Sequence, residues 1–295
     1  MLSGILAGVA AGALWGLVFV APRMVQGFNS VDLTAGRFVA YGIVAAAVCA
    51  WTRRPLPTAR QALAAAGLSL LGFTGYYLLL VLAIRDAGTE VPSLVIGTIP
   101  IWVMLLGKPG HLRWAALVPG ILLTAAGLLL MTFSPHGSAP AGMGAHYWRG
   151  IGFACASLVS WTAFALLNAA WLKRHPEVRA TEWANWLGLA TGAGALVLWA
   201  VGGSDLATLR AQPDAPLFLG LAAATGFGSA WLATILWNVA SRRLSASLCG
   251  QLIVSETLFA LAYSFAWDGR WPSLAQGAAV VLFTLGILAS IKAHR

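Results

Sequence analysis

The chain has 295 residues, of which 59% are hydrophobic and only 9% are charged, and its mean hydropathy is +0.81. A soluble domain carries about 25% charged residues, so this composition excludes a water-soluble globular protein and predicts an integral membrane protein. The formal charge of +9 does not indicate a nucleic-acid partner, because the basic residues stand singly or in pairs between apolar runs. We interpret them as topology signals at helix ends.

Ten apolar runs follow one another along the chain, and each has the roughly 20 residues that a helix needs to cross a bilayer. They cover approximately residues 3–22, 31–51, 61–84, 88–107, 112–133, 148–172, 181–202, 217–240, 244–266 and 271–291. The N-terminus has no basic stretch ahead of its apolar run and no small-residue cleavage site after it. We therefore expect the first run to be a retained helix and not a signal peptide.

Glycine recurs at every fourth position of the first run, at Gly4, Gly8, Gly12 and Gly16. Such a stripe lies on one face of a helix and predicts close packing against another helix. A gliding surface for a conformational change is compatible with the same pattern.

Two connections are longer than the others, residues 134–147 and residues 203–216, and both are rich in proline, glycine or charge. The first joins the fifth run to the sixth, so we predict that it links two halves of five spans each. The predicted units are residues 1–133 and residues 148–295, with residues 134–147 as the linker.

The distribution of lysine and arginine predicts the orientation in the membrane. With the N-terminus in the cytoplasm, twelve of the 18 basic residues fall in inner segments and five in outer segments, while Arg37 lies within a span. Ten of the 14 tryptophans lie near predicted span ends, as expected of rings that favour the membrane interface. We therefore predict an all-α membrane protein of ten helices with both termini in the cytoplasm.

Three sets of residues recur in the same order in the two halves. They are Gly4 and Trp15 with Gly150 and Trp161; Gly72, Phe73 and Tyr77 with Gly226, Phe227 and Trp231; and Arg113, Trp114 and Gly120 with Arg270, Trp271 and Gly277. This colinear recurrence indicates an internal duplication. Because each half has an odd number of spans, the second half inserts upside down, and the resulting inverted repeat suits a carrier that works by alternating access.

Several short motifs stand at particular places in the ten-span plan. They are Leu14-Trp15-Gly16, Arg37-Phe38 and Pro100 in the first half, and Ser255-Glu256-Thr257-Leu258-Phe259 and Asp268-Gly269-Arg270-Trp271-Pro272 in the second. Together they resemble the drug/metabolite transporter superfamily in its EamA-type branch, and the second set is similar to the aromatic amino acid exporters of the YddG type. The resemblance covers essentially the whole chain. It implies export of aromatic and other neutral amino acids across the bacterial cytoplasmic (inner) membrane.

The chain departs from the family pattern at one position. The pattern has a proline in the ninth span, where this chain has Thr257. The behaviour of that span as a hinge is therefore left open.

Polar-tipped aromatic residues near the middle of predicted spans are candidates for the wall of a substrate cavity. They are Trp15, Tyr76, Tyr77, Trp102, Trp161 and Trp231. An indole N–H that faced lipid would lack a partner, so these residues either pack between helices or line a cavity. Tyr76 and Tyr77 point about 100° apart on a helix, so we expect only one of them to face the cavity, and the repeat favours Tyr77.

A zwitterionic amino acid also needs polar partners inside the membrane. The intramembrane polar candidates for substrate binding are Asn168, Gln251 and Ser255, together with Asn238 and Thr98. Hydrogen bonding to other helices is the alternative for each of them.

Pro100 removes a backbone hydrogen bond in the middle of the fourth span, so we expect a kink there. Carbonyl groups freed by such a break could bind an ammonium group. Pro100 is accordingly a candidate for gating.

Two ionisable residues lie inside predicted spans and are further candidates for gating or coupling. Arg37 either extends outward to the membrane surface, or pairs with Asp86 or Glu90, which the topology places on the same side, or holds a substrate carboxylate. Glu256 is the only carboxylate predicted near mid-depth, where a charge costs about 2.5–3.5 kcal/mol. An internal hydrogen bond and a role in proton coupling are the two alternatives for Glu256.

No motif in the sequence indicates an enzyme, a cofactor or a metal site. The chain lacks a Gly-x-x-x-x-Gly-Lys-Ser/Thr phosphate loop, a His-Glu-x-x-His motif and a Gly-x-Ser-x-Gly elbow. Cys49, Cys155 and Cys249 lie within apolar runs and share no ligand-like spacing.

The sequence thus predicts a small-molecule carrier in the lipid bilayer, with no cofactor and no nucleic-acid partner. Aromatic and neutral amino acids are the expected substrates, and hydrophobic cations or drugs are the alternative. Ten spans that enclose their own cavity are consistent with a functional monomer.

Overall fold

The computed structural model describes residues 1–53, 56–88, 90–132, 145–269 and 271–295, and the regular secondary structure in these residues is helical throughout. Nine helical segments in these ranges are long and apolar enough to cross a membrane, and Pro92–Leu106 is a shorter apolar helical stretch. These ten segments follow the ten predicted spans in order, which confirms the predicted all-α membrane fold.

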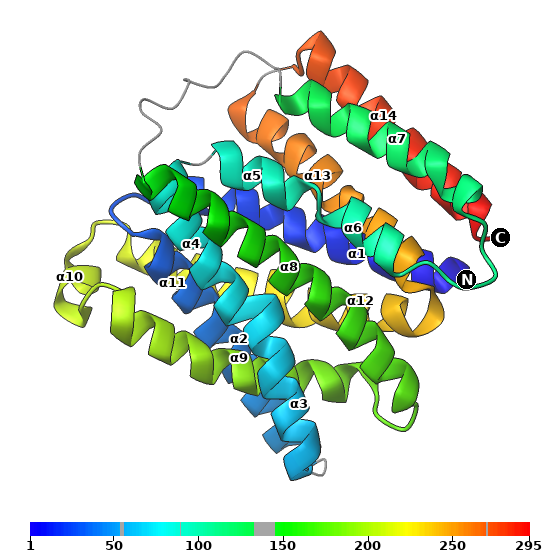
Figure 1. The fold of residues 1–295 in the computed structure, drawn as a ribbon. Helices are drawn as coiled ribbons and strands as arrows, with labels where there is room; N and C mark the ends of the chain where they lie inside the picture. The colour runs from blue at the N-terminus through cyan, green and yellow to red at the C-terminus, as the bar shows by residue number, and fades with distance from the viewer. Residues whose placement is uncertain (54–55, 89, 133–144, 270) are drawn as a thin grey trace.

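The helices fall into two series along the chain (Figure 1). In the first half they are α1 (Leu2–Gly16), η1 (Leu17–Phe19), η2 (Ala21–Met24), α2 (Ser30–Thr52), α3 (Ala59–Ser69), η3 (Leu70–Thr74), α4 (Gly75–Ala87), α5 (Glu90–Gly97), α6 (Ile99–Leu106) and α7 (Trp114–Thr132). In the second half they are α8 (Ala145–Arg174), α9 (Ala180–Gly202), α10 (Leu206–Ala211), α11 (Ala215–Thr225), η4 (Gly226–Leu232), α12 (Ala233–Arg243), α13 (Ala246–Asp268) and α14 (Leu274–Ala293).

Short polar residues begin many of these helices by accepting a hydrogen bond from a backbone N–H of the first turn. Thr58 forms a capping box with Gln61 at the start of α3, and Ser273 forms one with Gln276 at the start of α14. Asp205 caps α10 in the same way by accepting from the backbone N–H of Thr208. The predicted loop 203–216 therefore contains a short helix, which its length and polarity did not indicate.

The two Gly-Phe motifs interrupt their spans with π-helical turns. Leu70–Thr74 forms η3 between α3 and α4, and Gly226–Leu232 forms η4 between α11 and α12. A Cβ atom added at Gly72 would meet the ring of Phe164, so only glycine allows this approach. The same irregular turn at matching places in both halves supports the internal duplication, and π-helical turns often occur at functional sites.

The fourth span is broken, as the sequence predicts. α5 ends at Gly97 and α6 begins at Ile99, with Thr98 between them and Pro100 in the first turn of α6. The ninth span, in contrast, is the single helix α13, and it continues through Thr257. The two equivalent spans therefore differ, because only the first of them contains a proline.

Helix neighbours obey a two-fold relation between the halves. The second spans of the two halves, α2 and α9, pack together extensively, and so do the fifth spans, α7 and α14 (Figure 1). The pairing of α4 with α8 is matched by that of α12 with α1, because each joins a third span to the first span of the other half. This reciprocity is the arrangement expected of an inverted repeat.

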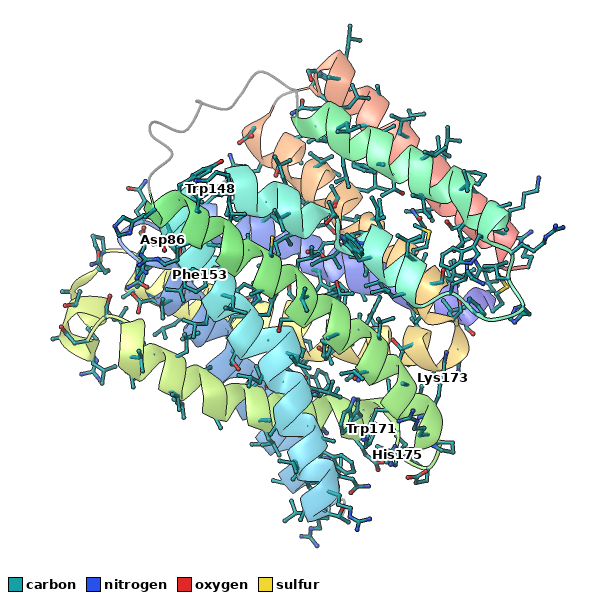
Figure 2. The ribbon with its side chains drawn as sticks, in the orientation of Figure 1. Asp86, Trp148, Phe153, Trp171, Lys173 and His175 are labelled. Atoms are coloured by element: carbon teal, nitrogen blue, oxygen red, sulfur yellow. The ribbon has the colours of Figure 1, made fainter. Side chains whose placement is uncertain are left out.

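Both chain ends lie at the same end of the bundle (Figure 1). In Figure 2, Asp86 and Trp148 lie near one end of α8, and Lys173 and His175 lie near the other. Since Lys173 belongs to the basic inner segments, the end with both termini is the cytoplasmic one.

Some residues used in the sequence analysis lie outside the described residues. These are Arg54 and Arg270, which entered the orientation count, the side chain of Glu90, a predicted partner of Arg37, and most of the predicted linker 134–147. Its last residues, 145–147, are already helical and form the start of α8.

Candidate functional site

Three tryptophans from three helices meet inside the bundle. The ring centroids of Trp15 (α1) and Trp237 (α12) are 5.3 Å apart, and those of Trp161 (α8) lie 6.3 Å from Trp15 and 6.1 Å from Trp237. Trp237 is buried, whereas Trp15 and Trp161 keep part of their surface exposed. We call Trp15, Trp161 and Trp237 the tryptophan cluster.

Sequence reasoning missed Trp237. The predicted eighth span ended at residue 240, which placed Trp237 near the membrane interface, but α12 continues to Arg243 and carries this ring deeper. The indole Nε1 of Trp237 is buried and has no hydrogen-bond partner. The basic pair Arg242-Arg243 can mark the end of a span. It was the signal in the sequence that could have placed the end of the eighth span three residues later.

A chain of aromatic contacts leads away from the tryptophan cluster. Trp161 contacts Phe164 at 6.0 Å between ring centroids, Phe164 contacts Phe73 at 5.4 Å, and Phe73 contacts Phe38 at 5.8 Å. Phe38 in turn contacts Tyr77 at 5.2 Å. Rings from α2, η3, α4 and α8 thus join both halves of the chain through edge-to-face contacts.

Tyr76 and Tyr77 differ as expected for neighbours on a helix. Tyr76 is buried, while Tyr77 is partly exposed and contacts both Phe38 and the guanidinium group of Arg37. Of the two tyrosines, Tyr77 is therefore the one with free surface beside the charged group.

Arg37 lies in α2 and is only 7% exposed. Its guanidinium carbon is 4.6 Å from the ring centroid of Phe38 and 4.8 Å from that of Tyr77. The predicted ion pair with Asp86 is wrong: Asp86 accepts from Arg149 Nε at 2.6 Å and from Arg85 Nε at 3.1 Å. Asp86 lies at the outer end of α4, where that helix packs against α8. Arg149 belongs to α8 and is therefore close enough to bind Asp86.

Glu256 lies in α13 and is partly exposed. Its carboxyl group lies within electrostatic range of Arg37, and both groups lie within range of the hydroxyl group of Tyr76. Within the described part of the chain, Glu256 makes no ion pair. A guanidinium group and a carboxyl group, one from each half of the chain, thus border the aromatic residues without a direct ion pair between them.

The polar side chains predicted to bind substrate are engaged by protein groups instead. Asn168 accepts from Trp183 Nε1 at 2.7 Å and donates to Asn238 Oδ1 at 3.1 Å. Gln251 donates to Thr124 Oγ1 at 2.9 Å and accepts from Ser290 Oγ at 3.1 Å. Helix-to-helix bonding, the alternative for these residues, is what the structure contains.

Ser255 and Trp231 are likewise bonded within the protein. Ser255 donates to the carbonyl oxygen of Leu252 in its own helix at 2.7 Å. Trp231 donates to Asn185 Oδ1 at 2.7 Å, and its ring contacts Phe227 at a centroid distance of 5.3 Å. Trp231 remains partly exposed, so it keeps surface for other contacts.

Trp102 lies apart from the aromatic residues described above. Its side chain belongs to α6 and is 45% exposed, and among the described residues no ring packs against it. The structure therefore does not bring Trp102 together with Trp15 and Trp161.

The bundle is packed tightly on the cytoplasmic side of these residues. Every residue of α13 from Ser247 to Ser255 is buried, whereas those from Glu256 to Phe259 are partly exposed. The backbone N–H of Ser247 donates to the carbonyl oxygen of Gly107 at 3.1 Å, and this bond joins the ninth span to the end of the fourth. A Cβ atom added at Gly250 would lie 2.9 Å from Val103 Cβ and Met104 N, so these helices touch along their backbones.

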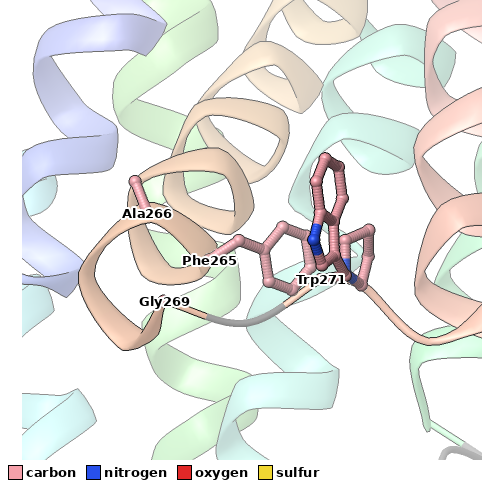
Figure 3. A pocket seen from close by; sticks show the side chains of 5 residues that line it. Phe265, Ala266, Gly269 and Trp271 are labelled. Carbon is pink, nitrogen blue, oxygen red and sulfur yellow. The ribbon is translucent and has the colours of Figure 1, made fainter.

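An apolar pocket of about 360 Å³ lies at the outer end of α13 (Figure 3). It is lined by Phe265, Ala266, Gly269, Trp271 and Pro272. Gly269 ends α13 with a positive φ of 59°, which turns the chain toward α14. Its described lining carries no charged side chain and shares no residue with the tryptophan cluster.

Of the residues in and around the tryptophan cluster, Trp15, Trp161 and Tyr77 keep part of their surface exposed. Metal binding finds no support there, since the described residues contain no group of three or more His, Cys, Asp or Glu side chains able to hold an ion. Aromatic faces, one guanidinium and one carboxylate are the available chemistry.

Comparison with known proteins agrees with this architecture. The model of the EamA-like transporter family matches residues 2–133. The inner membrane protein YtfF of Escherichia coli (strain K12) is 31% identical over 310 aligned positions, which cover 99% of this chain and 96% of the relative. A crystal structure of a protein with 22% identity superposes with a TM-score of 0.79 over 98% of each chain, which shows a common fold. The chain is therefore a multi-pass protein of the bacterial inner membrane and a member of the EamA-like transporter family.

Proposed function

We propose that this transporter exports aromatic and other neutral amino acids through a central cavity between its two halves. The observation that supports the proposal best is that aromatic contacts link the tryptophan cluster to the guanidinium group of Arg37, while neither Arg37 nor Glu256 forms an ion pair among the described residues. Aromatic side chains stack on such rings with about 0.5–1.5 kcal/mol per pair beyond the burial of area. The two charges complement the two ends of a zwitterion.

Alternating access is the mechanism that we propose for export. The inverted repeat supports it, because each half can adopt the conformation of the other. The packing of α13 supports it as well, since its cytoplasmic part is buried and its outer part is partly exposed. In our interpretation the structure is closed toward the cytoplasm, and the fourth and ninth spans separate at their inner ends when the cavity opens inward.

Counterflow in proteoliposomes tests the proposal. Vesicles preloaded with unlabelled phenylalanine should accumulate radiolabelled phenylalanine, and threonine should support a slower exchange. Empty liposomes and vesicles that contain an unrelated ten-helix carrier are the controls. If no amino acid exchanges above the level of these controls, the proposed function is wrong.

Efflux of hydrophobic cations is the second candidate, and Glu256 is the residue that favours it. A carboxylate next to several aromatic rings can bind a cation through charge and through the ring faces. Arg37 opposes this candidate because it places a positive charge at the same site. Counterflow with tetraphenylphosphonium, run beside phenylalanine in the same vesicles, separates the two candidates.

Proton coupling through Glu256 is part of the same test. A proton-linked exporter should respond to a pH gradient, and the variant Glu256→Gln should lose that response while its fold is retained. A facilitator without coupling should exchange phenylalanine at the same rate with and without the gradient. If the transport rate of Glu256→Gln responds to the pH gradient as that of the unmodified protein does, Glu256 takes no part in proton coupling.

We further propose that one chain is the functional unit in the bilayer. The tryptophan cluster, Arg37 and Glu256 all come from a single chain, and they lie between its two halves. Reconstitution at less than one chain per vesicle should therefore preserve counterflow in proportion to the number of occupied vesicles.

A further inference from the structure

Arg37 is a buried charge without a counter-ion among the side chains that the structure describes. The residue is 7% exposed, its Nε has no hydrogen-bond partner, and among the described residues it takes part in no ion pair. Burying an unpaired guanidinium is costly, so such groups normally have an anion or water beside them. The carboxylates near Arg37 are therefore the first groups to consider.

Two of the carboxylates on the outer side are engaged elsewhere, and the side chain of a third, Glu90, lies outside the described residues. Asp86 is held by Arg149 and Arg85. Asp32, one and a half turns before Arg37 on α2, accepts from the backbone N–H and the hydroxyl group of Ser204, both at 2.7 Å. Neither is free to neutralise Arg37, and Glu256 acts on it electrostatically without forming an ion pair.

The surroundings of Arg37 hold the guanidinium in place. The rings of Phe38 and Tyr77 cover it at 4.6 and 4.8 Å, and cation–π contacts of this kind leave the N–H edges for other partners. The aromatic contacts through Phe38, Phe73 and Phe164 connect this position to Trp161. These three linking rings are buried, so the guanidinium and Trp161 belong to one packed aromatic network, in which Tyr77, Trp15 and Trp161 keep part of their surface exposed.

We propose that Arg37 binds the carboxylate of the transported amino acid and selects for solutes that carry a free carboxylate. The inference rests on the proposed function of an amino acid carrier. The guanidinium group presents its donors in a planar fork that matches a carboxylate with two parallel hydrogen bonds. The side chain of the solute then lies against the tryptophan cluster, and its ammonium group faces Glu256.

Ligands that differ in one end group test this assignment on the unmodified protein. Purified transporter in detergent is titrated with phenylalanine, with phenethylamine, which lacks the carboxylate, and with 3-phenylpropionate, which lacks the ammonium group. Loss of hydrogen bonds to a charged partner weakens binding about 10- to 100-fold, so phenethylamine should bind that much more weakly than phenylalanine. Equal binding of phenylalanine and phenethylamine would overturn the role of Arg37 while leaving amino acid transport intact.

Variants of Arg37 provide the second arm. Arg37→Gln should lose affinity for phenylalanine and 3-phenylpropionate by about 10- to 100-fold and leave phenethylamine binding nearly unchanged. Arg37→Lys keeps the charge but loses the planar fork of donors. Its affinity for phenylalanine should therefore lie between those of the unmodified protein and Arg37→Gln. Arg23→Gln is the matched control, because Arg23 is half-exposed and pairs with Asp268 at the outer surface.

Three outcomes would count against the inference, and they are distinguishable. If Arg37→Gln weakens all three ligands equally, Arg37 supports the fold and does not bind the carboxylate. If Arg37→Gln binds phenylalanine as tightly as the unmodified protein does, the carboxylate of the solute binds at another residue. If the unmodified protein neither binds nor exchanges any amino acid, the proposed function itself is wrong.

Discussion

Residues of one type take different roles here according to their partners. The indole N–H groups of Trp183 and Trp231 donate to asparagine side chains, whereas that of Trp237 is buried without a partner. Trp102 has the same chemistry but is 45% exposed. The sequence contains all of these tryptophans in apolar runs, and only the packing of the helices separates structural rings from rings that can meet a solute.

The selectivity for aromatic solutes should depend on the tryptophan cluster. We expect Trp161→Leu to lower the preference for phenylalanine over threonine by about 2- to 12-fold, the equivalent of one aromatic pair worth 0.5–1.5 kcal/mol. The ratio of the counterflow rates for phenylalanine and threonine measures this preference. Trp102→Leu removes a ring outside the cluster and should leave the ratio unchanged, and an equal drop in both variants would contradict the assignment.

The buried amide of Asn168 should contribute to stability, not to binding. Asn168→Leu leaves Trp183 Nε1 and Asn238 without their partner, and each unsatisfied buried group costs about 1–3 kcal/mol. We expect a lower unfolding temperature in detergent, read by differential scanning fluorimetry. Thr284→Ala removes an exposed hydroxyl that bonds within its own helix and should have little effect. If the Asn168→Leu protein is as stable as the unmodified protein but transports poorly, Asn168 contributes to substrate binding.

At the scale of elements, glycine controls how closely helices approach. Gly4, Gly8, Gly12 and Gly16 are all buried in α1, and this helix packs against α12 and α13. Gly72 and Gly226 play a comparable part in the π-helical turns of both halves. The four-residue spacing in α1 predicted the contact face correctly, because a period of four lies along one side of a helix.

Gly12 should be the least replaceable of these glycines. In Gly12→Ala the new methyl group would meet Ser255 Oγ and lie 2.9 Å from the backbone nitrogen of Glu256, so α1 and α13 must separate. Overpacking of this kind costs about 1–3 kcal/mol, visible as a lower unfolding temperature.

Gly152→Ala is the matched control for that substitution. Gly152 is an exposed helical glycine with no atom within 4 Å of an added Cβ, so alanine should be neutral or slightly stabilising there. If both variants lose the same stability, close packing at Gly12 is not the cause.

At the scale of the whole molecule, the two-fold relation between the halves organises the site. The equivalent fourth and ninth spans meet on the cytoplasmic side, where α6 packs against the start of α13. Arg37 and Tyr77 come from the first half, and Trp237 and Glu256 come from the second. A change in how the halves pack therefore alters the site and the inner contact together.

Locking the inner contact should stop transport. A Cβ atom at Gly107 would lie 2.8 Å from Ala246 Cβ, so cysteines at both positions are close enough to form a disulfide after a small shift. In a background with alanine at Cys49, Cys155 and Cys249, oxidised Gly107→Cys/Ala246→Cys should show no counterflow, and dithiothreitol should restore it. The Gly107→Cys single variant controls for crowding, because its Cβ would also lie 2.8 Å from Ser247 N. Each single variant should transport at the same rate under both conditions, and full activity of the oxidised pair would exclude separation of these spans.

Features that depend on local composition could be predicted from the sequence. The ten spans, the orientation and the break at Pro100 were all predicted, because hydropathy, charge and proline act through the segment that contains them. The recurrence of Gly72-Phe73 as Gly226-Phe227 predicted the duplication, although not the π-helical turns that these motifs form.

What only the tertiary structure decided is which side of each helix faces inward. Trp237 joins the tryptophan cluster and Trp102 does not, and Asp86 binds Arg149 in place of Arg37. In a soluble protein an amphipathic pattern would mark the inner face, but here the lipid and the protein core are both apolar. The rotation of most helices therefore depends on packing between residues far apart in the chain, and the glycine stripe of α1 is the exception that carries a local signal for it.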